Sequence, residues 1–91
     1  MRTPSYTNAF KRDIKRITKR GKDLNKLDKV MEILETGKPL DKKYRDHALV
    51  GNLKGTRDLH IEPDWLLLYK ITDTEVEYVR TGKHNDVFSN Y

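Results

Sequence analysis

The chain has 91 residues, of which 35% are hydrophobic and 36% charged, and its formal net charge at pH 7 is +5. This length predicts one domain, spanning residues 1–91, with a small core. The lack of cysteine excludes disulfide bonds, thiol catalysis and thiolate zinc sites. No apolar run approaches the roughly 20 residues of a membrane helix, and the first residues lack a signal-peptide core. The sequence therefore predicts a cytoplasmic protein without a membrane partner.

The first twenty residues predict a short strand followed by an amphipathic helix. Residues 2–6 have strand character, and Pro4 restricts them to a sheet edge because it cannot donate a ladder hydrogen bond. Thr7 is a suitable N-cap for a helix over residues 8–20. One face of this helix is apolar, with a spacing of three or four residues, at Phe10, Ile14 and Ile17.

The same helix carries two rows of basic residues, which the helical period places opposite its apolar face. These rows are Lys11, Lys15 and Lys19, and Arg12, Arg16 and Arg20. A charged face of this kind is solvated by default. Because the whole chain is basic, a polyanionic partner is also favoured, either nucleic acid or an acidic protein, and the rows then become a candidate binding surface.

A second amphipathic helix is predicted over residues 24–36. Gly21 suits the position after the first helix, and Asp23 can cap the second. The apolar positions of the second helix form a broad stripe at Leu24, Leu27, Val30, Met31, Ile33 and Leu34. Gly37 and Pro39 end the helix. Two helices joined by so short a link are expected to pack as an antiparallel hairpin.

After this helix the pattern changes from helix to strand. Residues 38–50 predict a loop, and strands are predicted over residues 53–61, 65–71 and 76–81. The middle strand is apolar on both faces, as is typical of a central strand. The sequence therefore predicts an α+β domain in which the two-helix hairpin covers one face of an antiparallel sheet. The other face is expected to be free to hold a site.

Three histidines lie in three different segments of this arrangement. His47 is in the loop, His60 is at a strand end, and His84 follows the last strand. In a meander, the start of the second strand lies near the end of the first and the end of the third. Asp64 and Trp65 are therefore expected close to His60 and His84. The loop that carries His47 enters from the opposite end and has to fold over the sheet to join them.

Such a cluster can cleave RNA without a metal. Imidazole titrates at about pH 6.5, so one histidine can act as a base while another acts as an acid. The base would deprotonate the ribose 2′-OH, which attacks its own phosphodiester, and the acid would protonate the leaving 5′-oxygen. Lys54, Arg57 and Arg80 are candidates to stabilise the phosphate charge. Aromatic side chains suited to stacking on bases are Tyr44, Trp65 and Phe88.

Each of these residues also has an alternative interpretation. A single histidine more often has a surface or structural role than a catalytic one. A lone tryptophan such as Trp65 is more often part of the core, and Pro63 with Asp64 is a common turn pair. A metal site from the three histidines and Asp64 is conceivable, but the usual close-spaced ligand pairs are absent from the sequence.

Three stretches of the sequence resemble the YafQ branch of the RelE-type toxin superfamily, the toxin halves of type II toxin–antitoxin pairs. The main one is "HALVGNLKGTRDLHIEPDWLLLYK" at residues 47–70, with its specific "RDLHIEPDW" string. The others are "YVRTGKHNDVF" at residues 78–88 and "GKDLNKL" at residues 21–27. The resemblance covers most of the chain.

The resemblance implies a RelE-like α+β fold with a short first strand. It also implies endonucleolytic cleavage of mRNA in the ribosomal A site, with neither a metal nor another cofactor. Residues that match the branch's proposed catalytic positions are His47, His60, Asp64 and His84. Trp65 and Phe88 match its supporting aromatic positions, and Arg80 matches a basic one. The sequence does not assign the general acid and the general base among the histidines.

The resemblance further implies three partners. An acidic antitoxin would neutralise the toxin, the ribosome with its mRNA would be the target, and promoter DNA would be bound indirectly through the toxin–antitoxin complex. Phosphates of rRNA would attract the basic rows of the first helix. Two other functions remain open: a non-catalytic RNA- or ribosome-binding domain of the same fold, and a co-repressor component that acts only in a DNA-binding complex. The complete set of catalytic residues favours the endoribonuclease.

Overall fold

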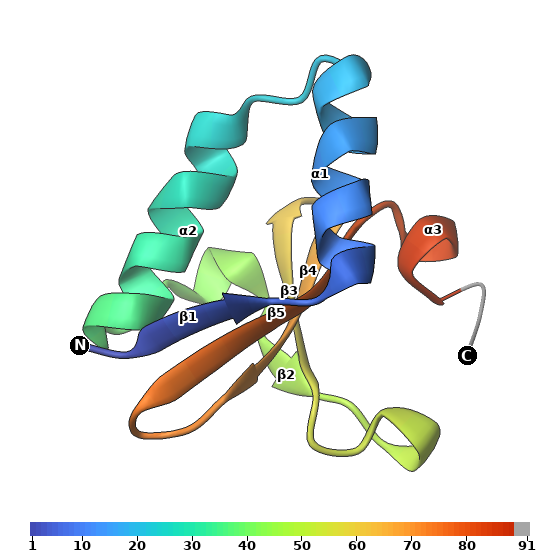
Figure 1. Cartoon of the computed structure of the whole chain (residues 1–91). Coiled ribbons are helices and arrows are strands. Elements are labelled where there is room, and N and C mark those ends of the chain that lie inside the picture. Colours follow the sequence, from blue (N-terminus) through green and yellow to red (C-terminus); the bar gives the residue numbers. More distant parts are fainter. Residues whose placement is uncertain (89–91) are drawn as a thin grey trace.

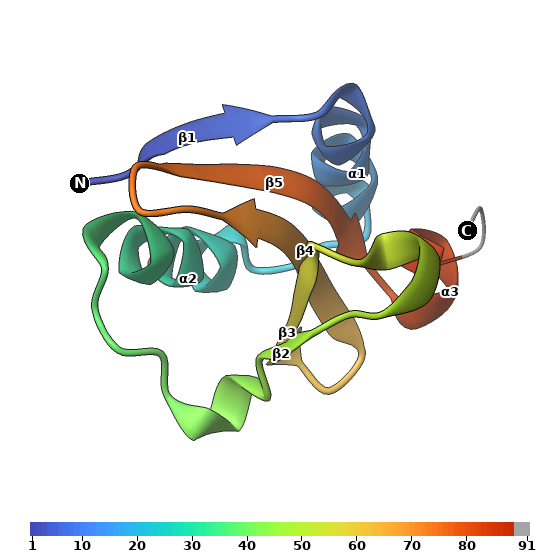
Figure 2. The same ribbon diagram turned by 90° about the horizontal axis from the view of Figure 1, so that it is seen from below.

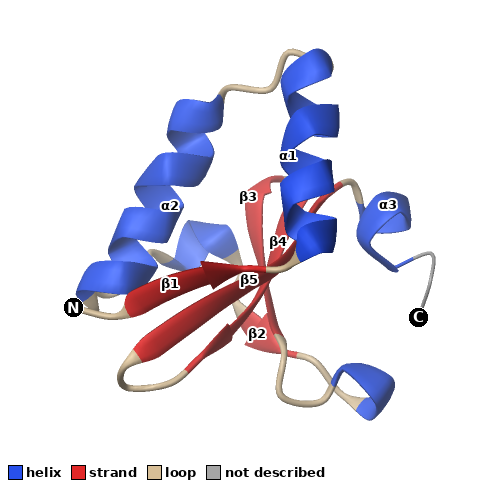
Figure 3. Ribbon diagram, in the orientation of Figure 1, coloured by secondary structure: helices blue, strands red, loops and turns tan. Residues whose placement is uncertain are grey.

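The computed structural model describes residues 1–88, which form a five-stranded sheet with two long helices on one face (Figures 1 and 3). In chain order the elements are β1 (Thr3–Tyr6), α1 (Asn8–Lys19), α2 (Leu24–Thr36), η1 (Lys42–Tyr44), β2 (His47–Ala48), η2 (Gly51–Leu53), β3 (Arg57–Glu62), β4 (Trp65–Ile71), β5 (Glu75–Gly82) and α3 (His84–Phe88). Within this range, none of the helices has the length and hydropathy needed to cross a membrane.

The strand order in the sheet is β1-β5-β4-β3-β2. The predicted antiparallel meander of β3, β4 and β5 is confirmed, and β4 is the central strand. The expectation of a purely antiparallel sheet is wrong in one detail, because β1 pairs with β5 in parallel. Parallel pairing needs a long crossover, and the chain between β1 and β5 supplies one. Pro4 lies on the edge strand, as expected, opposite Val76.

The two long helices begin and end close to the predicted positions because their signals are local. The Thr7 hydroxyl accepts a hydrogen bond from the Phe10 amide at 2.9 Å, and the Asp23 carboxylate accepts one from the Asn25 amide at 3.0 Å. Gly37 ends α2 in the left-handed conformation, with φ 75°. The helices run antiparallel and diverge from their link, so that both cover the same face of the sheet (Figure 1).

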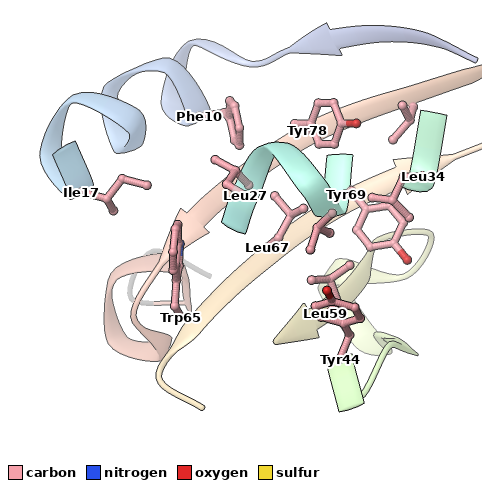
Figure 4. Packing of buried hydrophobic residues seen from close by; sticks show 12 residues of the cluster. Phe10, Ile17, Leu27, Leu34, Tyr44, Leu59, Trp65, Leu67, Tyr69 and Tyr78 are labelled. Atoms are coloured by element: carbon pink, nitrogen blue, oxygen red, sulfur yellow. The ribbon is translucent and has the colours of Figure 1, made fainter. Parts of the chain in front are cut away.

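The main core lies between these helices and the sheet (Figure 4). Phe10, Leu27 and Leu34 from the helices meet the inner residues of β4, Leu67 and Tyr69. Strand alternation sends Leu66 and Leu68 to the other face, where they pack against Val87 of α3. The predicted open face is therefore partly covered, because the predicted tail is a short helix.

The segment before β3 differs from the prediction. The strand begins at Arg57 instead of residue 53, and residues 51–53 form a short 3-10 helix. Gly51 and Gly55 adopt positive φ values of 68° and 93°, which allow the chain to fold back on itself. As a result His47 and Ala48 form the additional strand β2, which pairs antiparallel with β3.

Candidate active site

A buried carboxylate, Asp58, lies among the three histidines. Alternation along β3 places Asp58 and His60 on the same face of the strand, and the register of β2 puts His47 opposite Asp58. His47 Nε2 is 3.7 Å from Asp58 Oδ2. Burial raises the pKa of Asp58, and the charges of His47, His60 and His84 act in the opposite direction, in that order. All three histidines therefore act electrostatically on one carboxyl group, Asp58, which the prediction left out.

Asp58 is 4% exposed, and its Oδ1 has no hydrogen-bond partner among the described residues. A buried polar atom without a partner costs about 1–3 kcal/mol, so such atoms are uncommon in a stable fold. Protonation of Asp58 would remove the separate cost of burying its charge, and a donor that reached Oδ1 would satisfy the unpaired oxygen. The raised pKa and the unpaired oxygen both favour a carboxyl group that can exchange a proton with its neighbours.

Two of the histidines are held in the same tautomer. His47 Nδ1 lies 3.0 Å from the Arg45 carbonyl oxygen, and His60 Nδ1 lies 3.4 Å from that of Pro63. A carbonyl oxygen only accepts, so both Nδ1 atoms carry hydrogen and donate it. In the neutral rings Nε2 then has the lone pair, and Nε2 is the nitrogen available for proton transfer.

His84 begins α3, and its ring packs against that of Phe88, with 4.6 Å between ring centroids. Val87 fixes this helix on the sheet. Asp86 fixes it on α1, since its Oδ2 lies 2.8 Å from Arg20 Nη1 and 3.9 Å from Arg16 Nε. In the second basic row, Arg16 and Arg20 therefore interact with α3, although the Arg20 side chain remains 42% exposed. The exposed basic residues of α1 are Lys11, Arg12, Lys15 and Lys19.

Asp64 is exposed in the turn between β3 and β4, close in sequence to His60. Among residues 1–88, no hydrogen bond or ion pair joins Asp64 to the histidines. The neighbouring Glu62 has a structural role, accepting from Lys22 at 3.0 Å and from Lys26 at 2.8 Å. These contacts, with that of Lys26 the strongest, lower the pKa of Glu62. The turn is thereby held against the start of α2.

Arg57 is half-buried and is paired with Asp46, at 2.7 Å between Nη2 and Oδ2. Tyr69 also donates a short hydrogen bond to Asp46, and burial together with this acceptor raises the pKa of Tyr69. Asp46 directly precedes His47. The contacts of Arg57 therefore position the strand that carries a candidate catalytic residue, whereas Lys54 is exposed in the loop before β3.

The structure gives Trp65 and Arg80, both predicted to contact the substrate, other partners within the fold. Trp65 is fully buried, and its Nε1 donates to Thr81 Oγ1 at 2.9 Å, so its ring is a core anchor and is not presented to a base. Arg80 is bound to the buried Asp13, with 2.7 Å between Nε and Oδ2, and its Nη2 donates to the Asp86 carbonyl at 3.0 Å. This pairing joins β5 to α1 and engages the guanidinium of Arg80 within the fold.

No cluster of three or more histidine and acidic side chains within residues 1–88 has the geometry of a metal site.

The central acid, Asp58, had a signal in the sequence, since it precedes His60 by two residues in a strand and therefore shares its face. Its burial had no such signal, because burial depends on the tertiary packing around the strand.

Comparisons with known proteins match this sequence and fold. The model of the YafQ family, a bacterial toxin of type II toxin–antitoxin systems, matches residues 2–89. The mRNA interferase toxin YafQ of Escherichia coli K12 is 45% identical over 84 residues, which cover 91% of each chain. In the crystal structure of the E. coli DinJ–YafQ toxin–antitoxin complex, the similar chain has a TM-score of 0.89 and 44% identity, over 96% of this chain and 97% of that one. A metal-bound toxin from Helicobacter pylori has a TM-score of 0.89 and 41% identity, over 97% of this chain and 100% of that one.

The architecture is thus the one that these small bacterial toxins share. The chain belongs to the YafQ family of toxins of type II toxin–antitoxin systems. The resemblance inferred from the sequence and the expected toxin fold are both confirmed. The expected enzyme class, endoribonuclease, agrees with the name mRNA interferase that the E. coli relative carries.

Proposed function

We propose that this chain is a ribosome-dependent mRNA interferase that cleaves mRNA in the A site by acid–base catalysis. The observation that carries the proposal is the convergence of His47, His60 and His84 around the buried Asp58. Such a group offers several proton donors and acceptors near neutral pH at one place on the surface. Its members come from three separate elements, so the arrangement depends on the fold.

In this mechanism the ribose 2′-oxygen attacks the adjacent phosphorus as a base removes its proton. A new O2′–P bond forms, the P–O5′ bond breaks, and an acid gives a proton to the departing O5′. The products are a 2′,3′-cyclic phosphate and a 5′-OH. Nε2 of His47 and of His60 are the nitrogens suited to these transfers. Asp58 serves as a positioning residue that holds His47 and balances its charge.

Asp64, in the turn between β3 and β4, and His84, at the start of α3, are both exposed and accessible to an RNA strand. We assign one of them to one of the two proton transfers, either removal of the 2′-OH proton or donation of a proton to O5′. Phe88 supports the His84 ring and offers an aromatic face beside it. Lys54 and the exposed basic residues of α1 would contribute attraction for phosphate.

The proposed partners follow from the family. The complex of the similar E. coli toxin with DinJ supports a cognate acidic antitoxin for this chain, and through it indirect binding to promoter DNA with autoregulation of transcription. The basic charge of +5 suits both an acidic antitoxin and rRNA. We place the action in the cytoplasm, where ribosomes and mRNA meet, and we expect the chain to act as one domain.

Two single variants test the assignment. Expression of His84→Ala or Asp64→Ala is expected to relieve the growth arrest caused by the wild-type chain, since general acid–base catalysis contributes about 10²–10⁴-fold to rate. Both side chains are exposed, so thermal unfolding of the purified variants is expected to match that of the wild type. Lys83→Ala, next to His84 and also exposed, serves as the matched control and should remain toxic. Full toxicity of both test variants would overturn the assigned site.

The role of metals is tested separately, because a similar toxin from H. pylori is described as metal-bound. We expect cleavage on intact ribosomes to persist after the toxin is treated with EDTA and desalted. Activity that disappears on this treatment and returns with added copper or zinc would replace the metal-free mechanism.

A further inference from the structure

A second basic feature lies beside His60. β2 pairs with Arg57 and Asp58, and leaves the edge of β3 beyond them uncovered. There α2, η1 and the end of β3 enclose a pocket of about 400 Å³. Figure 2 shows the chain leaving α2 and passing through η1 before it enters β2 beside β3. The residues of interest in its lining are Lys26, Lys29, Lys43, Arg45, His60 and Glu62.

The charge of this pocket is strongly positive. Four cationic residues and a single carboxylate line it. The carboxylate, Glu62, is already occupied by Lys26 and by Lys22 outside the pocket, at 2.8 and 3.0 Å. Lys29, Lys43 and Arg45 take part in none of the ion pairs found within residues 1–88. A concave surface with uncompensated positive charge attracts an anion.

The pocket is also connected to the candidate active site at two points. His60 belongs to both. Arg45 lines the pocket, and its carbonyl oxygen receives the Nδ1 hydrogen bond of His47 at 3.0 Å. Arg45 has a φ of 52°, and among residues 1–88 it alone has positive φ without being glycine. A conformation of this kind is uncommon and is often found at functional sites.

These observations favour RNA over an acidic peptide as the ligand. A peptide-binding groove needs exposed apolar surface for anchor residues. Here Tyr44 is buried in the main core and Ile61 is partly buried against it, so Pro63 is the one exposed apolar residue of the lining within residues 1–88. The exposed side chains of the lining include Lys29 and Lys43, which can reach the phosphates of a flexible strand.

We propose that this pocket is a subsite for backbone phosphates of the substrate RNA, next to the phosphodiester that is cleaved. The inference rests on the proposed ribonuclease function, and it adds the place where the strand is held beside the scissile bond. The catalytic histidines would then receive a strand that is already positioned, which is a direct contribution to the rate.

The first experiment measures binding without cleavage. The probe is a single-stranded RNA fully methylated at its 2′-oxygens, which removes the attacking group. Lys29→Gln with Lys43→Gln is compared with Lys38→Gln with Lys70→Gln, a control that removes the same charge from exposed lysines outside the pocket. Each phosphate contact contributes about 0.7 to the slope of log K against log salt for single strands. The pocket variant should reduce this slope by about 1.4, and the control should leave it close to the wild-type value.

The second experiment locates the contact. Single phosphates of the probe are replaced in turn by uncharged methylphosphonates, and each probe is tested with both proteins. At phosphates next to the cleavage position, the replacement should weaken binding to the wild type and have little additional effect on the pocket variant. Such non-additivity identifies groups in contact.

Three outcomes overturn the proposal. The salt dependence of RNA binding could have the same slope in the pocket and control variants, or the methylphosphonate effects could be additive with the pocket variant at every phosphate. The pocket variant could also keep the wild-type RNA slope but bind the acidic antitoxin more weakly. The last would assign the pocket to the antitoxin. Because the probe cannot be cleaved, these results are independent of whether His84→Ala abolishes toxicity, and failure of the subsite is distinguishable from failure of the ribonuclease function.

Discussion

Asp58 determines how the candidate site responds to pH. Its pKa is raised, chiefly by burial, so the folded state binds this proton more tightly than the unfolded state does. The stability that Asp58 contributes is therefore complete below its unfolded pKa and is lost as pH rises through the folded value. The ionised form of Asp58 is the one that burial penalises, and positive charge on the three histidines opposes this effect.

The variant Asp58→Asn tests this assignment, since it removes the titration while keeping the shape. The free energy of unfolding of the variant, relative to wild type, should improve between pH 3.5 and pH 7, as measured by urea denaturation. RNA cleavage should fall by about 10-fold to 100-fold, the range typical of a group that orients a reacting residue. Identical pH dependence of stability in the two proteins would show that Asp58 titrates normally.

Asp13 is the acid on which the connection of α1 to β5 depends. It is 1% exposed and accepts hydrogen bonds from Arg16 at 2.5 Å, from Arg80 at 2.7 Å and from the Thr81 amide at 3.1 Å. Removal of one partner of a buried ion pair costs about 3–5 kcal/mol, because the remaining charge loses its partner. Asp13→Ala should lower the free energy of unfolding by about this amount. Asp28→Ala, an exposed acid on α2, should change it by no more than about 0.5 kcal/mol.

At the scale of elements, the two-residue strand β2 brings His47 to the site. Its position is fixed by Asp46, which contacts both Arg57 and Tyr69. Short strands contribute few ladder hydrogen bonds, so side chains at their ends have a large share in holding them. The side chain of Asp46 therefore acts on catalysis through the position of its neighbour.

Asp46→Ala should release β2 from β3. Cleavage is expected to fall by about 10-fold to 100-fold. The Leu49 amide next to β2 donates to the Thr56 carbonyl at 2.9 Å, and its hydrogen exchange, measured by NMR, should become faster in the variant. Tyr69→Phe keeps the ring in the core and removes one of the two contacts, so its effect should have the same direction and be smaller. Unchanged hydrogen exchange of the Leu49 amide in Asp46→Ala would show that β2 is held by other contacts.

The elements differ in how far the sequence could predict them. The helices were predicted to within about one residue because their caps, such as Thr7 and Gly37, are local signals. The strand β2 was missed because its two residues gain strand geometry only from pairing with β3. The parallel pairing of β1 was missed for a similar reason, since a four-residue segment with a proline carries no information about its direction.

In the candidate site, too, residue types could be predicted from the sequence, whereas roles that depend on distant contacts could not. The three histidines and Asp64 were identified from residue type and resemblance, and their use in catalysis remains a prediction. The core role of Trp65 was one of two interpretations that the sequence left open, and its contact with Thr81 decides between them. The role of Arg80 could not be predicted, because it is determined by a distant partner, Asp13. Glu62 likewise gained its structural role from two lysines near the start of α2.

For the whole molecule, the distribution of charge distinguishes two basic surfaces: the pocket beside His60 and the exposed face of α1. Lys15 and Lys19 are exposed on α1, whereas Arg16 and Arg20 pair with Asp86. The exposed lysines are therefore the ones to test for contact with rRNA. Lys15→Glu with Lys19→Glu should weaken co-sedimentation with ribosomes, most strongly at low salt. Lys38→Glu with Lys70→Glu makes the same change in net charge elsewhere, and an equal loss with this control would show that only the total charge matters.

The most direct test of the proposed mechanism is the chemistry of the cut ends. Programmed ribosomes are incubated with the wild-type chain in the presence of mRNA, and the new termini of the cleaved mRNA are identified by mass spectrometry and by labelling with polynucleotide kinase. Attack by the 2′-OH with proton transfer among the histidines predicts a 2′,3′-cyclic phosphate on one fragment and a 5′-OH on the other. Fragments ending in a 3′-OH and a 5′-phosphate would contradict this mechanism, because they require attack by water on the phosphorus from the opposite side.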